Sequence, residues 1–274
     1  MLDKSRITAA IWTWGTDARD QMEQAAADVT EIGYRSFESV KAAIHAYNLD
    51  LDAYKEVLKR YDLNPVSFYF HLPPFGEEES IFSTLDKELE FVAELGVKRI
   101  CLQATGGHPG KLDESQLEFE LKLIEKFARK TKSFGLTSNL HNHHNTWVMY
   151  ENEIDNILKN LGSDVISFAP DTAHLIAGLC DPVKVIGKYA DRVNFIHLKD
   201  ISTSYVESNG ISSAGMEVYG NFRELGQGIV DFRKVFDILK SVGYDGPLCE
   251  ELDSAPVSNK LSALNNYNFI INNY

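Results

Sequence analysis

The feature that most constrains the fold of this chain is a regular alternation of short β-like runs with longer amphipathic runs. The runs between the β-like segments have the apolar period of helices, and several of them end in Gly, as helices commonly do. Most of the β-like runs recur about every 30 residues, which is the rhythm of βα units. Eight such units predict an α/β fold, a (β/α)₈ TIM barrel. The eight runs are RITAAIW (6–12), YRSFES (34–39), PVSFYFH (65–71), VKRICLQ (97–103), GLTSNLH (135–141), DVISFAPD (164–171), RVNFIHLK (192–199) and GPLCEE (246–251).

The chain shows no internal boundary. It has 274 residues, and no low-complexity tract or Pro/Gly/Ser-rich linker divides it. We therefore expect one TIM-barrel domain over residues 1–274, a normal length for this fold. One interval between β-like runs is long and rich in Ser, Gly and Asn. It predicts an enlarged loop at about 200–229 on the active-site face of the barrel.

The charge balance argues against a nucleic-acid partner. The formal net charge is −13, and an acidic surface repels phosphate backbones. We expect a small polar or neutral molecule as the substrate.

Cysteine usage and the lack of long apolar runs indicate the compartment. Cys101, Cys180 and Cys249 lie far apart and outside any C-x-x-C pair, which favours a reducing environment without disulfides. No apolar run approaches the length that spans a bilayer, and the first residues carry no leader pattern. We predict a cytoplasmic protein without a membrane partner, and a homo-oligomer remains open.

Side-chain parity identifies the residues that face into the barrel, because side chains alternate between the two faces of a strand. In DVISFAPD, Ile166 and Phe168 suit the apolar outer face, so Asp171 faces inward. By the same reasoning Glu250 faces outward. Polar residues at four further strand ends also turn inward, namely His71, His141, His197 and Glu251.

The inward polar residues converge on the face where barrel enzymes carry out chemistry. Two imidazoles and two carboxylates around one axis suit Mn²⁺, Co²⁺, Zn²⁺ or Fe²⁺, with positions left for water and substrate. His143 and Lys199 follow on the same parity and are predicted beside this site. Any one of these histidines could instead be a core or loop group, and HNHH (141–144) could be a polar loop. Convergence from four strands favours the metal.

Other segments near the strand ends leave alternatives open. Trp12 and Trp14 follow the first strand, where they could pack in the core or form a wall against a sugar ring. The segment TGGHPG (105–110) predicts a turn, since nothing in it resembles a P-loop. His144 is predicted to be a loop residue.

Several motifs resemble the xylose-isomerase-like barrel superfamily of sugar isomerases, epimerases and dehydratases, and the resemblance extends over nearly the whole chain. The most specific are PDTAHL (170–175), RVNFIHLKDI (192–201), ELGQGIVDFRKVF (224–236) and YDGPLCEELD (244–253). Within that superfamily, HNHHNTWVMYENEID (141–155) is most similar to inosose dehydratase.

The resemblance implies one divalent metal ion, Mn²⁺ or Co²⁺ before Zn²⁺, Fe²⁺ or Mg²⁺. The ligands carried over from the superfamily are His141, Asp171, His197 and Glu251, and His141 stands where its isomerases and epimerases have Glu. His174 matches a residue that contacts substrate. The apurinic endonucleases of the superfamily need a further D-x-H pair, which YGNFRELGQG (219–228) lacks.

These features together predict a metal-dependent dehydratase, a carbon–oxygen lyase that acts on a keto-inositol or related keto-sugar. It would remove a proton beside a carbonyl and eliminate water. A metal-dependent sugar isomerase or epimerase is the alternative, and a sugar-binding barrel without catalysis is the second. The predicted catalytic residues are His143, Lys199 and Glu251, and the predicted substrate contacts are Trp14, His71, Gln103 and His174.

Overall fold

Eight parallel strands form one sheet in the order β6-β5-β4-β3-β2-β1-β10-β7. The structure, a computed structural model, describes residues 2–15, 17–202 and 216–274. Parallel bridges between Phe168 and Val193 and between Asp171 and His197 join the two ends of the sheet. The prediction of a (β/α)₈ barrel is confirmed, and each β-like run overlaps its strand, with β2 and β3 each extending one residue beyond the run. The strands are β1 (Ile7–Ala10), β2 (Ser36–Val40), β3 (Asn64–His71), β4 (Arg99–Gln103), β5 (Thr137–His141), β6 (Ile166–Phe168), β7 (His197–Leu198) and β10 (Leu248–Glu250).

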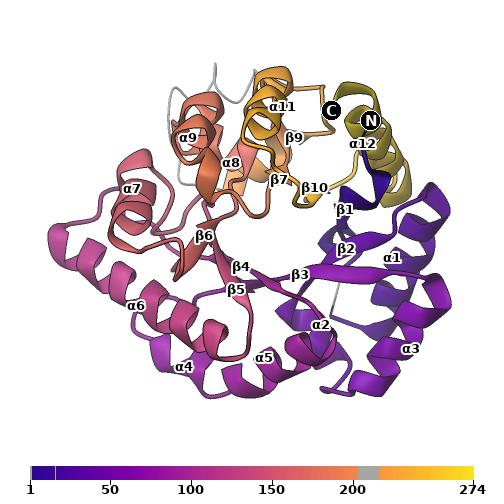
Figure 1. Cartoon of the computed structure of the whole chain (residues 1–274), viewed down its shortest axis with the longest axis horizontal. Coiled ribbons are helices and arrows are strands. Elements are labelled where there is room, and N and C mark those ends of the chain that lie inside the picture. The colour runs from indigo at the N-terminus through magenta and orange to yellow at the C-terminus, as the bar shows by residue number, and fades with distance from the viewer. Residues whose placement is uncertain (1, 16, 203–215) are drawn as a thin grey trace.

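The helices surround this sheet (Figure 1). Several begin at an Asp whose carboxylate accepts a backbone N–H of the first turn, as Asp50, Asp113 and Asp231 do. The last helix returns beside the start of the chain, and the Arg6 guanidinium donates a hydrogen bond to the Tyr274 hydroxyl. The helices are α1 (Arg19–Ile32), α2 (Lys41–Ala46), α3 (Leu51–Tyr61), α4 (Glu78–Phe82), α5 (Leu85–Glu94), α6 (Glu114–Ser133), α7 (Glu151–Asn160), α8 (Thr172–Ala177), α9 (Pro182–Lys188), α11 (Phe232–Ser241) and α12 (Asn259–Asn273).

The predicted enlarged loop begins and ends at a small antiparallel pair. β8 (Asp200–Ile201) pairs with β9 (Phe222–Arg223), which follows the 3₁₀ helix η4 (Met216–Asn221). The Asp200 carboxylate accepts hydrogen bonds from the N–H groups of Gly226, Gly228 and Val230 and so ties the end of this segment to its start. Residues 203–215 of the predicted loop lie outside the described residues.

The strands divide the core into an outer and an inner part, as the parity argument predicts. Phe68, Phe168 and Leu248 belong to the large cluster that includes the helix side chains. A small group of apolar side chains lies inside the barrel and consists of Ala10, Cys101, Ala169, Phe195 and Cys249. Among the described residues, no helix is both long and apolar enough to cross a membrane.

Candidate metal and substrate site

A cavity of about 340 Å³ opens at the carboxyl ends of the strands. Four residues singled out from the sequence lie on its wall: His71, Gln103, His143 and Glu251. The other lining residues are Trp12, Val40, Lys41, Ala42, Tyr69, Tyr219 and Asp253. The cavity therefore combines an aromatic wall with ionisable groups, which suits a polar ligand with apolar ring faces.

Each of the four predicted metal ligands carries one buried donor atom without a hydrogen-bond partner. Buried polar atoms are rarely left unpaired, because an unpaired one loses its hydration without compensation. A divalent cation would satisfy all four atoms at once, so the residues present fit such an ion. The atoms are His141 Nε2, Asp171 Oδ2, His197 Nδ1 and Glu251 Oε2.

The two carboxylates lie together at the floor of the cavity. Asp171, Glu251 and His174 have donor atoms within 4.8 Å of one another. Burial and the charge of Glu251 hold the pKa of Asp171 well above its usual range. Burial would also raise the pKa of Glu251, but Lys199 and His197 overcome this and hold that pKa well below its usual range. The two pKa shifts are opposite in direction, and a bound cation would favour ionisation of both carboxyl groups.

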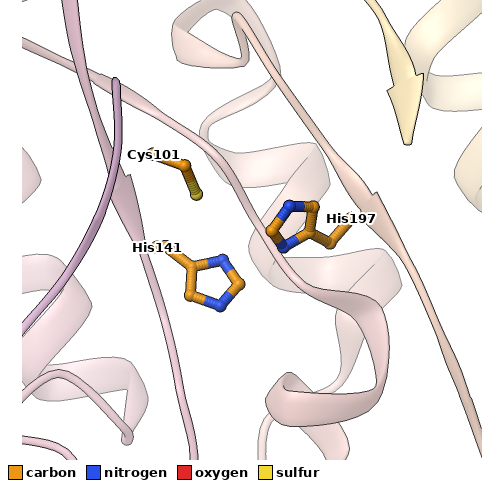
Figure 2. A group of neighbouring side chains, drawn as sticks. All are labelled: Cys101, His141 and His197. Atoms are coloured by element: carbon orange, nitrogen blue, oxygen red, sulfur yellow. The ribbon is translucent and has the colours of Figure 1, made fainter. Parts of the chain in front are cut away.

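The two imidazoles lie on the neighbouring side of the floor. His141 Nδ1 donates to the Ala169 carbonyl at 3.3 Å, which leaves Nε2 free to accept or to bind an ion. His197 Nδ1 lies 2.9 Å from Glu251 Oε2, a contact that lacks hydrogen-bond geometry. Figure 2 shows both rings together with Cys101, whose sulfur points toward the space beside them.

Glu38 is a buried partner of this site that the sequence analysis did not single out. It lies on β2, and its carboxylate accepts hydrogen bonds from His197 Nε2 and from the Ser67 hydroxyl at 2.7 Å. The contact with Nε2 fixes the His197 ring and leaves Nδ1 as the atom directed at Glu251. A signal was present in YRSFES, since Glu38 shares its strand face with Ser36 and not with the apolar Phe37.

Lys199 lies behind the cavity wall, fully buried. Its ammonium group lies 2.6 Å from Glu251 Oε1 and 2.6 Å from Asp253 Oδ2. Burial opposes the charge, but Asp253 and Glu251 outweigh it and raise the pKa of Lys199. This side chain is therefore a fixed cation that positions two carboxylates, and the structure does not place it on the surface that a ligand would touch.

The fold and these motifs agree with one known family. The chain matches the xylose isomerase-like TIM barrel family over residues 26–268. It belongs to this family. The resemblance seen in the sequence is thereby confirmed.

Relatives of this xylose isomerase-like barrel include inosose dehydratases. The inosose dehydratase of Clostridium tetani is 26% identical over 279 residues, covering 93% of this chain and 91% of the relative. Among solved structures, the IolI protein with a bound zinc atom is 14% identical with a TM-score of 0.78, and each chain is covered to 97%. An L-ribulose 3-epimerase is 17% identical with a TM-score of 0.76, covering 98% of this chain and 93% of that one.

Two further histidines of this xylose isomerase-like barrel pack against each other beside the predicted metal ligands. The rings of His143 and His174 have centroids 3.8 Å apart. His143 Nδ1 donates to the His144 carbonyl at 2.8 Å, so its Nε2 is the accepting atom. His174 is fully buried behind His143 and does not line the cavity.

The aromatic wall differs from the prediction in one respect. Trp14, the predicted wall residue, lies outside the cavity lining, and its indole N–H donates to Asp28 on α1 at 2.9 Å. Trp12 lines the cavity instead and packs against Tyr69 and His197. The cause is local, because β1 ends at Ala10 and the 3₁₀ turn Trp12–Trp14 breaks the strand alternation.

Proposed function

We propose that the protein is a divalent-metal-dependent dehydratase of a keto-inositol or a closely related keto-sugar. The observation that carries the proposal is the set of four buried donor atoms without a hydrogen-bond partner, from His141, Asp171, His197 and Glu251. Of these residues Glu251 lines the polar cavity, and the other three are fully buried beside it. The similarity to inosose dehydratases over 93% of the chain supports this substrate class. When bound, the divalent ion would supply a positive charge that polarises a ketone oxygen.

His143 is the residue that we assign to proton abstraction. It lines the cavity, and its Nδ1 hydrogen bond to the His144 carbonyl leaves Nε2 as an acceptor. Desolvation and the nearby charge of Lys199 lower the pKa of His143 to about 3. The ring is therefore neutral at physiological pH and its Nε2 is open to a proton, but so low a pKa makes it a weak base. The role therefore requires that the ion acidify the proton beside the ketone.

Asp253 is the residue that we assign to protonation of the departing hydroxyl group. It lines the same cavity as His143, and its side chain is 23% exposed. Burial raises the pKa of Asp253, although the neighbouring Lys199 opposes the shift. The role requires that Asp253 take up a proton before the hydroxyl leaves. In the elimination, the C–H bond beside the ketone breaks, a C=C bond forms, and the hydroxyl on the next carbon leaves with the proton from Asp253 as water.

The contacts of Glu251 favour elimination over epimerisation. Epimerisation needs one base on each face of the substrate, one to remove the proton and one to return it. Here Lys199 binds Glu251 Oε1, and Oε2 faces His197 Nδ1. With Oε1 bound to Lys199 and Oε2 assigned to the ion, Glu251 is a poor second base, whereas elimination requires only the one base that His143 provides.

Product analysis over a panel of keto-inositols and open-chain keto-sugars tests the proposal. We expect a product that has lost one water. His143→Gln should lower kcat by about 10²–10⁴ without changing the bound metal, whereas His45→Gln is the matched control because His45 pairs with Glu88 away from the cavity. A stereoisomer of unchanged mass as the main product would establish an epimerase in place of a dehydratase.

A further inference from the structure

A thiol lies inside the barrel next to the two imidazoles of the site. Cys101 on β4, His141 on β5 and His197 on β7 have donor atoms that all lie within 4.8 Å of one another. All three side chains are fully buried. Cys101 pairs with Asn139 in the β4–β5 register, whereas Gln103, which lines the cavity, pairs with His141. The thiol therefore lies one layer deeper in the barrel than the cavity floor.

The thiol of Cys101 differs from the other two in its hydrogen bonding. Cys180 Sγ donates to the Gly178 carbonyl at 3.3 Å, and Cys249 Sγ donates to the Glu250 carbonyl at 3.7 Å. Across residues 2–15, 17–202 and 216–274, Cys101 Sγ has no such acceptor, although it lies beside His141, whose Nε2 also lacks a partner. A thiol and an imidazole nitrogen without a partner therefore share one buried space (Figure 2).

The chemistry of these donors selects a different ion from the set at the cavity floor. Thiolate and imidazole ligands suit Zn²⁺ and related thiophilic ions, whereas the carboxylates of Asp171 and Glu251 suit harder ions such as Mn²⁺ and Mg²⁺. Both sets use His141 and His197. His141 Nδ1 donates to the Ala169 carbonyl, so Nε2 is the one nitrogen of that ring open to an ion. This nitrogen cannot bind two ions, so the two sets exclude each other.

We propose that Cys101, His141 and His197 form an inner metal site for a thiophilic divalent ion, and that its occupation prevents an ion from binding at the cavity floor. When this site fills, a sulfur–metal bond forms and the thiol proton passes to solvent. Zn²⁺ or Cd²⁺ bound at the inner site would occupy both imidazoles, which would then be lost to the ligand set at the cavity floor. It does not depend on the reaction proposed above.

Titration of the metal-free full chain with Co²⁺ and Cd²⁺ tests this proposal. We expect a sulfur-to-metal charge-transfer band in the wild type and its loss in Cys101→Ser and in Cys101→Ala. Cys180→Ser is the matched control, since Cys180 is a buried thiol outside the donor groups that could hold a metal ion, and it should keep the band. Asp171→Asn should also keep the band, because Asp171 belongs only to the ligand set at the cavity floor.

A second measurement needs no substitution. X-ray absorption at the zinc edge of the wild-type protein should show one sulfur atom bound to the ion. Bound zinc with only nitrogen and oxygen neighbours would overturn the inner site, as would a charge-transfer band that persists in both Cys101 variants or disappears in Cys249→Ser alone. These results do not bear on the dehydratase proposal, which would fail separately if no keto-sugar lost water with Mn²⁺ or Co²⁺ bound.

Discussion

Glu250, the last residue of β10, and Glu251, which follows it, point into two different buried polar clusters. The clusters differ in whether their buried polar atoms all have hydrogen-bond partners. Glu250 faces outward toward α12, where it accepts a hydrogen bond from Asn266 at 2.7 Å. Nearby, Glu224 accepts from Ser262 at 2.7 Å and from Asn265 at 2.8 Å. We call these residues of the α12 contact the outer cluster. Within the described residues, none of their buried side-chain atoms lacks a partner.

We call the four predicted metal ligands the inner cluster, which is distinct from the Cys101 site described above. Unlike the outer cluster, it contains buried atoms that lack a hydrogen-bond partner. Glu251 follows Glu250 directly, yet its Oε2 is among the four unsatisfied atoms. A buried polar group costs free energy unless it is paired, so the outer cluster is complete as protein alone and the inner cluster calls for a further partner. The comparison separates a structural polar cluster from a binding site without reference to any relative.

The largest effect should come from Asp171→Asn in the inner cluster. We expect the variant to lose its divalent ion and its activity, down to the background rate. The asparagine keeps the cap of α8, since the Asp171 carboxylate accepts from the His174 N–H at 2.7 Å and Asn caps helices equally well. The metal-free variant should therefore unfold at the same temperature as the metal-free wild type. Metal analysis and thermal unfolding measure both, and a large drop in stability would make Asp171 structural.

A smaller effect should come from Glu38, which orients one ligand. Glu38→Ala should weaken metal binding by about 10–100-fold, the usual cost of losing a group that orients a ligand. Glu38→Gln should restore part of the affinity, because an amide oxygen still accepts from His197 Nε2. Ser39→Ala is the matched control on the outer face of β2, where Ser39 accepts from the Tyr54 hydroxyl at 2.9 Å. Calorimetric titration with Mn²⁺ would show equal affinities for all variants if Glu38 had no such role.

A substitution in the outer cluster should lower the stability of the fold and leave metal affinity unchanged. Glu224→Ala leaves Ser262 and Asn265 without their acceptor and should cost about 1–3 kcal/mol for each group that stays unsatisfied. Metal affinity should not change, because none of these residues lines the cavity. Denaturant unfolding gives the free energy of unfolding, and metal titration of the same preparation gives the affinity. A loss of metal binding at unchanged stability would show that Glu224 belongs to the binding site and not to a structural cluster.

The outer cluster should also produce a pH dependence of stability, at Glu250. Burial raises the pKa of Glu250 to about 8, above the value of about 4.3 for an unfolded chain. The folded state therefore holds this proton more tightly, and the resulting stability is complete below pH 4.3 and lost as the pH rises through 8. Glu250→Gln should remove that part of the decline. Unfolding free energies across this range would refute the assignment if both proteins declined equally.

The sequence alone was enough to predict the barrel and the inward direction of the four predicted metal ligands. Strand runs recur with the βα rhythm, and parity distinguishes Glu251 from Glu250 because both lie at the end of a regular strand. Prediction from strand alternation failed for residues beyond the end of a strand and for partners contributed by another strand. Parity could not place Trp12 and Trp14, which lie in a 3₁₀ turn.

Two residues of the site escaped prediction for physical reasons. Glu38 becomes important only through its contact with His197, which lies 159 positions away in the chain. Asp253 lies beyond the end of β10, where alternation no longer sets direction. Its position beside Lys199 is a tertiary contact that no local pattern in the sequence reports.

The most direct test of the account is the metal content and activity of one preparation, measured before and after removal of divalent ions. The inner cluster predicts about one divalent ion per chain at the cavity floor, with loss of water from a keto-inositol only while that ion is bound. Activity should vanish on chelation and return when Mn²⁺ or Co²⁺ is added to that stoichiometry. Full dehydratase activity in protein shown to be free of metal would contradict the account.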